Sequence, residues 1–184
     1  MVRIDAADAA NDLEQTLAAA APNGLAAVVD AVPLRSPPES VELVAFDGEA
    51  WRREAEDPLR RALHVLQGAY AGLRGTGGRI VVLLPSAVTT GAPGAVASIA
   101  AAEGYRSLAK AAARTWGRDG VTVNCLLVAA DADLSRPGLQ PPALGRPSAL
   151  RSDVTSVIAT LLSPGFAAVT GATIAVDGGV WMTP

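Results

Sequence analysis

The sequence contains one cysteine, one histidine and no long apolar run, and each scarcity excludes a class of structure. Cys125 has no second cysteine to pair with, so an internal disulfide cannot form, and we expect a protein of the reducing cytoplasm. One histidine, one cysteine and no carboxylates at ligand spacing argue against a metal site. Charged residues, glycine or proline interrupt every apolar run before the roughly 18 residues that span a bilayer. We therefore expect no membrane association and no secretion signal.

What the sequence has in abundance is apolar residues. They make up 50% of its 184 residues, and the mean hydropathy is +0.30. Parallel strands buried on both faces explain such a composition. The net charge of -3 argues against general affinity for nucleic acid. The length is that of one domain with its own core, and we expect residues 1–184 to form a single domain.

Strand and helix signals alternate along the chain. This alternation predicts an α/β fold, a parallel sheet between helical layers with right-handed crossovers. The segment 41–46 fits either a short strand or a loop. Strands are predicted at 2–5, 25–31, 79–85, 121–128 and 171–179, and helices at 6–24, at 56–74, after residue 94 and at 152–163.

The helix predicted at 56–74 has the clearest signals. Asp57 is a candidate N-cap and Pro58 suits the first helical position. His64 falls outside its apolar face, so we expect a solvated or interface histidine. The predicted apolar face consists of Leu59, Leu63, Leu66, Tyr70 and Leu73, opposite Arg60, Arg61 and Gln67.

Four segments of the second half resemble the short-chain dehydrogenase/reductase family. They are "GGRIVVLL" (77–84), "GVTVN" (120–124), "GRP" with "SDV" (145–147 and 152–154) and "LLSPGFAAVTGATIAVDGG" (161–179). The resemblance implies a three-layer Rossmann-like fold with a mostly parallel sheet and, in active members, an NAD(P) cofactor. "VRID" (2–5) resembles the family's third strand, so the chain is expected to lack the first two strands and the glycine-rich turn that seats the pyrophosphate. We expect NAD(P) binding to be lost and no other cofactor to replace it.

The family sheet runs in the order 3-2-1-4-5-6-7, so removing two strands leaves an edge to be covered. We prefer the arrangement in which strand 2–5 moves beside strand 25–31 as a βαβ unit. A partner chain covering that edge is the alternative.

The family's catalytic pair is a tyrosine and a lysine four residues apart on one helix. Tyr105 and Lys110 are five apart, so their side chains diverge by roughly 140°. Counted back from "GVTVN" without a gap, the family tyrosine falls on Ser98 and its lysine on Ala102. We expect Tyr105 to be a core or interface residue.

Other family positions have also changed. The catalytic serine falls on Pro85, with Ser86 one place too late, and the asparagine of the proton relay falls on Pro58, which has no N–H. Asp30 stands at the start of the family's "NNAG", and Val128–Ala129 replaces its "PG". We therefore assign no catalytic and no cofactor-binding residue.

Polar side chains could still line the old substrate cleft. The only histidine is predicted on another helix, so no nucleophile–base pair is evident. Asp5 and Asp8, which resemble the family's adenine-side acids, are interpreted as turn and N-cap residues. The candidate cleft residues are Asp30, Ser86, Thr89, Thr90 and Ser98.

The leading hypothesis is a catalytically silent homologue of this family. It would serve as a structural subunit, in a homodimer or in a hetero-oligomer with an active full-length relative. Three alternatives stay open. In the first, the chain is a cofactor-independent cyclase, dehydratase or isomerase that acts on a hydrophobic small molecule. In the second, it is an oxidoreductase completed by another chain, and in the third it is a decayed fragment. A deep apolar cleft would favour the first alternative and a closed cleft the subunit.

Overall fold

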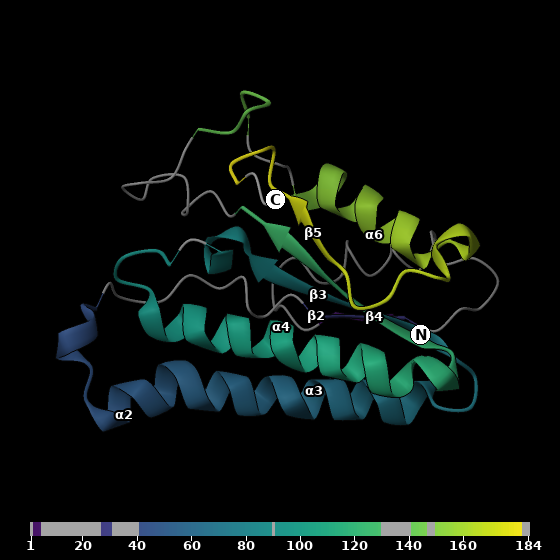
Figure 1. Ribbon diagram of the computed structural model, residues 1–184, viewed down its shortest axis with the longest axis horizontal. Coiled ribbons are helices and arrows are strands. Elements are labelled where there is room, and N and C mark those ends of the chain that lie inside the picture. Colours follow the sequence, from purple (N-terminus) through teal and green to yellow (C-terminus); the bar gives the residue numbers. More distant parts are fainter. Residues whose placement is uncertain are drawn as a thin grey trace.

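The computed structural model describes residues 2–4, 27–30, 41–89, 91–129, 141–146 and 150–181. They build a sheet of five parallel strands in the order β1-β2-β3-β4-β5 (Figure 1). The strands are β1 (Val2–Ile4), β2 (Ala27–Asp30), β3 (Gly78–Pro85), β4 (Val121–Val128) and β5 (Thr173–Val176).

The predicted pairing of the first strand with the second is confirmed. Val2, Arg3 and Ile4 lie opposite Ala27, Val28 and Val29 in parallel register. The helix predicted at 6–24 lies outside the described residues, as do Asp5 and Asp8. Of segment 41–46, only Val41 makes a β-bridge, to Ala95, while Leu43–Ala45 forms a 3-10 turn.

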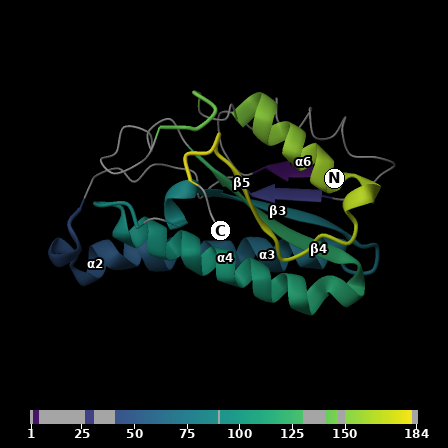
Figure 2. The same ribbon diagram turned by 45° about the horizontal axis from the view of Figure 1, so that its top comes forward.

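Helices cover both faces of the sheet, which confirms the three-layer arrangement. Helices α3 (Asp57–Leu73) and α4 (Val96–Trp116) lie on one face and α6 (Thr155–Leu162) on the other (Figures 1 and 2). Side chains alternate along a strand. In β3, Ile80, Val82 and Leu84 therefore pack with α3 and α4, and Val81 and Leu83 pack with α6.

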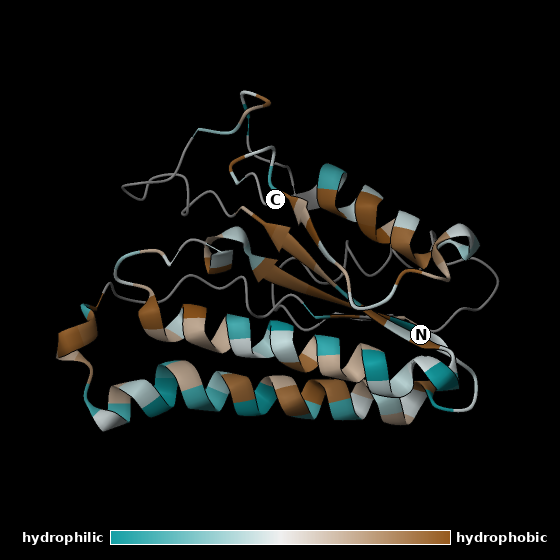
Figure 3. Ribbon diagram, in the orientation of Figure 1, coloured by the Kyte–Doolittle hydropathy of each residue, from teal (hydrophilic) through white to brown (hydrophobic). Residues whose placement is uncertain are grey.

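The central strands are buried on both faces, as their continuous apolar sequences predict. Every residue of β4 is buried. Figure 3 shows β3 and β4 almost wholly in the brown of hydrophobic residues, whereas α3 alternates between teal and brown along its length. Among the described residues, no helix is both long enough and apolar enough to cross a membrane.

The helix predicted at 56–74 is confirmed as α3, with Pro58 in its first turn, but the prediction of Asp57 as its N-cap is wrong. The helical segment begins at α2 (Gly48–Trp51), where the Asp47 side chain accepts a 2.7 Å hydrogen bond from the Ala50 N–H. A π-helical turn, Arg52–Glu56, then joins α2 to α3. Pro58 has no N–H to donate to an earlier turn, and the wider turn just before it lets the helix continue. The N-cap is therefore Asp47 and not Asp57.

The apolar face of α3 also differs from the prediction at one position. Leu63 is 40% exposed, whereas Ala62 is 2% exposed. The buried positions Ala62, Leu66, Ala69 and Leu73 follow spacings of four, three and four residues, which keep one seam against the neighbouring helix. The alanines of this seam pack in one core cluster with alanines of α4. Leu63 lies beside the seam, and His64 is exposed, as predicted.

The last helical segment begins with a π-helical turn, before the α-helix itself. A π-helical turn, Leu150–Val154, precedes α6, and it contains both residues predicted near the cap, Ser152 and Asp153. Asp153 pairs with Arg146 at 2.6 Å, which ties this turn to the loop before it.

Candidate active site

Tyr105 and Lys110 do not come together in the structure. Tyr105 is 2% exposed and packs in the core between α4 and the sheet, whereas Lys110 lies on the exposed side of α4. Their divergence agrees with the five-residue spacing. Lys110 is also the only lysine in the sequence, so no other amine of that kind can replace it.

The positions that match the family's tyrosine and lysine hold side chains of another chemistry. Ser98 is half-buried, and its Oγ donates a 3.0 Å hydrogen bond to the Ala95 carbonyl of the preceding turn. Ala102 is 4% exposed and contributes a methyl group to the core. One offers a hydroxyl that is already bonded locally, and the other offers no polar atom.

Tyr105 instead bonds to Asp30. Its hydroxyl donates a 2.7 Å hydrogen bond to the Asp30 carboxylate across 75 residues of sequence. Asp30 ends β2 but lies opposite Val82, in the middle of β3, so α4 covers it and it is 1% exposed. The Arg61 guanidinium of α3 lies 3.7 Å from the same carboxylate oxygen. These contacts join β2, α3 and α4 through a buried carboxylate.

This environment keeps the Tyr105 phenol protonated. Burial raises the pKa of Tyr105 most, and the Asp30 charge and its hydrogen bond to the phenol raise it further, while Arg61 acts in the opposite direction. A tyrosine that exchanges protons near neutral pH needs a lowered pKa. Tyr105 is therefore a hydrogen-bond donor of the core and is unsuited to proton transfer.

The other candidate cleft residues lie around the carboxyl end of β3. Ser86 is 2% exposed, in a short 3-10 turn that directly follows Pro85. Thr89 is exposed, and its Oγ1 donates a 2.9 Å hydrogen bond to the Ser86 carbonyl. Thr90 lies outside the described residues. The structure thus brings Ser86 and Thr89 together, and it places Asp30 beneath α4 with its carboxylate turned to Tyr105.

Pro58 and Cys125, two other residues considered in the sequence, have different surroundings. Pro58 is exposed at the start of α3. Cys125 is 1% exposed in β4, and burial raises the pKa of its thiol to about 12. A buried, protonated thiol is a weak nucleophile. In the part of the chain that the structure describes, no group of three or more histidine, cysteine or acidic side chains could hold a metal ion.

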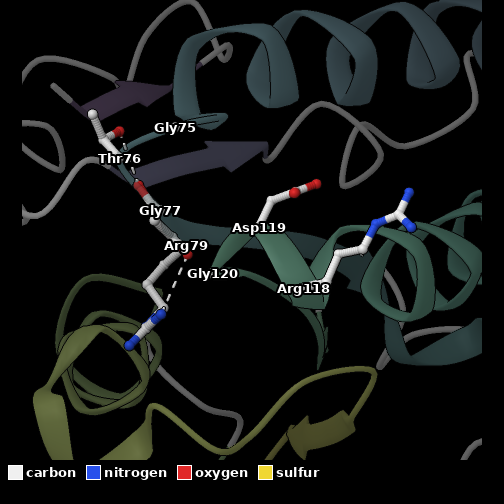
Figure 4. Close-up of a pocket in the computed structure, with 8 residues that line it drawn as sticks. Gly75, Thr76, Gly77, Arg79, Arg118, Asp119 and Gly120 are labelled. Carbon is white, nitrogen blue, oxygen red and sulfur yellow. Dashed lines mark hydrogen bonds between the residues drawn. The ribbon is translucent and has the colours of Figure 1, made fainter.

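Sequence patterns did not reveal two features. The helical pattern predicts Arg61 opposite the apolar face of α3, yet its guanidinium lies next to Asp30. A groove of about 420 Å³ also opens at the amino ends of β3 and β4, lined by the loops around Gly77 and Gly120 (Figure 4). The repeated glycines flanked by arginine, in "RGTGGR" and "GRDG", are the only sequence signal for this groove.

The described residues do not fit the nicotinamide end of a dinucleotide as the family holds it. The resemblance assigns the ribose to the lysine position and the proton to the tyrosine position. Here Ala102 has no donor, Ser98 bonds to its own helix, and Tyr105 is bonded to Asp30.

A parallel sheet between two helical layers, with candidate site residues around the carboxyl ends of its strands, defines a Rossmann-like α/β domain. Residues 2–181 match the family model described as "Enoyl-(Acyl carrier protein) reductase". The chain belongs to the short-chain dehydrogenase/reductase family, so it is homologous to oxidoreductases.

Relatives of known structure or activity agree with this membership. A 12alpha-hydroxysteroid dehydrogenase from a Clostridium species is 28% identical over 68% of this chain and 53% of the relative. A candidate oxidoreductase from Escherichia coli K-12 has a TM-score of 0.71 and 26% identity, covering 84% of this chain and 63% of that one. An acetoin dehydrogenase from Salmonella typhimurium, at 24% identity and a TM-score of 0.70 over 84% of this chain and 63% of that one, shares the fold. The chain thus spans about half to two thirds of the length of these relatives.

Proposed function

We propose that this chain is a catalytically silent member of its family and serves as a structural subunit. It would assemble as a homodimer or as a hetero-oligomer with an active full-length relative. The observation that carries the proposal is the pairing of Tyr105 with Asp30, while Lys110 lies on the exposed side of the same helix. A phenol held in this way cannot act as the family's proton donor.

The retained scaffold supports a structural role. Asn124 fixes the segment before β5 with two hydrogen bonds. Its Nδ2 donates to the Val169 carbonyl at 2.9 Å, and its Oδ1 accepts from the Ala172 N–H at 3.0 Å. The Asp177 carboxylate accepts from the Gly179 and Trp181 N–H groups and organises the turn after β5. Asn124 and Asp177 thus both have their hydrogen-bonding groups engaged in holding the fold, whereas the family's reactive pair is replaced.

The burial of the candidate residues after β2 and β3 supports the subunit over a cofactor-independent enzyme. Asp30 and Ser86 are 1% and 2% exposed, so neither offers a substrate an accessible acid or hydroxyl. A binding pocket needs convergent polar groups that a ligand can reach. Of the candidate cleft side chains, Thr89 is the one described as exposed.

Co-expression with each full-length family member of the source organism tests the proposal. We expect one relative to co-purify at equal stoichiometry, or the chain to form a homodimer, and the purified chain to bind neither NADH nor NADPH in a calorimetric titration. A full-length dehydrogenase of the family serves as the positive control for binding. Saturable binding of either nucleotide by this chain alone would contradict the proposal.

Kinship with dehydrogenases favours a second candidate, an oxidoreductase completed by another polypeptide. Mixing the chain with its partner and assaying NAD(P)-dependent oxidation of a hydroxysteroid and of acetoin separates the two. Tyr105→Phe in this chain should leave the rate per folded complex unchanged if the chain is structural. A loss of a hundredfold or more, with the complex still assembled, would support the second candidate.

A further inference from the structure

A groove at the amino ends of β3 and β4 is separate from the family's cleft. One side is the segment Gly75–Arg79, which runs from the loop after α3 into the first residues of β3. The other side is the turn Arg118–Gly120, which follows α4. Strands in a parallel sheet share one direction, so this groove lies at the edge opposite Pro85, where β3 ends. The groove has a volume of about 420 Å³ and is open to solvent.

Glycines make the two loops fit together. Gly77 and Gly120 have φ angles of 73° and 72°, which other residues rarely adopt. The Gly78 N–H donates a 3.1 Å hydrogen bond to the Gly120 carbonyl, and a Cβ on Gly77 would lie 3.1 Å from that oxygen. The floor of the groove is therefore a fixed backbone surface.

The charge around the groove is positive, although the chain as a whole carries -3. Arg79 and Arg118 line it. The one acid in the lining, Asp119, accepts a 2.8 Å hydrogen bond from the Tyr70 hydroxyl. Two lining arginines against one hydrogen-bonded carboxylate give the groove a net positive charge, which attracts anions.

Arg79 has unused hydrogen-bonding capacity. Its Nε is shielded from solvent and has no hydrogen-bond partner in the described part of the chain, and its NH1 reaches the Gly78 carbonyl only at 3.3 Å. An unpaired buried N–H is unfavourable, so an acceptor that draws the guanidinium outward would be favoured. Guanidinium groups suit phosphate and carboxylate oxygens because they donate in a planar fork.

The side chains of the two lining arginines point in opposite directions from the glycine loops. Figure 4 shows Arg79 directed toward α6 and Arg118 directed away from it. A monoatomic or compact anion can engage one guanidinium at a time, whereas an elongated molecule can reach both.

We propose that this groove binds a small organic molecule with an oxyanionic group at each end, either phosphate or carboxylate. Arg79 binds one end, Arg118 binds the other, and the backbone of the Gly77 and Gly120 loops supports the middle. The proposal does not depend on the subunit function proposed above, because it concerns the opposite edge of the sheet.

Titration at constant ionic strength tests this site. The probes are inorganic phosphate, the linear dicarboxylates from succinate to suberate, and fructose 1,6-bisphosphate, followed by amide and arginine Nε–H signals in NMR. We expect at least one two-ended probe to bind tenfold or more tightly than inorganic phosphate, with shifts at Gly77, Gly120 and the Arg79 Nε–H. The better probe series identifies phosphate or carboxylate as the preferred group.

Charge-matched variants separate a site from general attraction. Arg79→Gln and Arg118→Gln should each weaken the best two-ended probe at least fivefold. Arg60→Gln removes the same charge from an exposed position on α3, about 20 Å along the helix axis from Arg74, and should leave binding unchanged. Arg118 is exposed, so its variant is expected to fold even if the Arg79 variant does not. Equal losses in all three variants, no advantage of two-ended probes, or no saturable binding would overturn the proposal.

Discussion

Replacing Tyr105 by phenylalanine tests the central structural claim, that this tyrosine belongs to the core. The substitution removes one hydroxyl and keeps the ring, so no cavity of ring size is created. What is lost is the 2.7 Å hydrogen bond to Asp30, at a site where both side chains are no more than 2% exposed. Water cannot replace the missing donor without opening the packing of α4 on the sheet.

The expected loss follows from the charge of the acceptor. A hydrogen bond to a charged group contributes about 1.5 to 3 kcal/mol. The Arg61 guanidinium stays 3.7 Å from the carboxylate and compensates for part of the lost donor. We therefore expect Tyr105→Phe to lower the free energy of unfolding by about 2 kcal/mol, which lowers Tm by about 4–8 °C for a chain of this size.

The chain provides a matched control for this measurement. Tyr70 donates a 2.8 Å hydrogen bond to Asp119, nearly the same length, but Tyr70 is only half-buried, so water can replace it. Tyr70→Phe keeps the ring stacked on Trp116 at 4.6 Å and should lower the free energy of unfolding clearly less than Tyr105→Phe does. Urea unfolding of both variants, with m-values compared, measures the difference.

A double-mutant cycle assigns the loss to the pair. Asp30→Asn keeps the size of the acceptor and removes its charge, and its coupling to Tyr105→Phe should be about 1 kcal/mol or more. If Tyr105→Phe costs no more than Tyr70→Phe, the buried hydrogen bond does not contribute as argued, and the placement of Tyr105 in the core would be refuted.

Three further predictions concern pH, the thiol and the glycine loops. The pKa values of Tyr105 and Cys125 are raised in the folded state, so the unfolded chain loses these protons at a lower pH. The free energy of unfolding should therefore fall as pH rises above about 9, by up to about 1.4 kcal/mol per pH unit for each group. Urea unfolding from pH 8 to 11 checks this, and Cys125→Ala should flatten the slope; a flat profile in the parent protein would contradict it. Cys125, at 1% exposure, should react with a disulfide reagent at least about tenfold more slowly in the native state than in guanidinium chloride, and equal rates would show that the thiol is accessible. Gly77→Ala should cost about 1–2 kcal/mol because φ is 73°, whereas Gly72→Ala in α3, with no atom within 4 Å of the new Cβ, should gain up to about 1 kcal/mol. Urea unfolding of this pair should therefore give opposite signs, and the same sign would refute the backbone argument.

Much of the architecture was predictable because local patterns determine local structure. Continuous apolar segments predicted buried strands, and β3 and β4 lie where those segments are. The right-handed βαβ preference and the need to cover an edge predicted that β1 pairs with β2. Helix details were less predictable, since the α3 seam depends on which neighbour the helix meets, and contact with α4 favoured Ala62 over Leu63.

The candidate site divides in the same way. Sequence alone determined that Tyr105 and Lys110 diverge, because five residues on a helix turn a side chain to another side whatever surrounds it. Only the tertiary structure decided that Tyr105 meets Asp30 and Arg61, since contacts across 75 residues depend on how β2, α3 and α4 pack together. The groove between the Gly77 and Gly120 loops has the same origin. Angles along one helix follow from covalent geometry, whereas the partner of a buried polar group is selected by the whole fold.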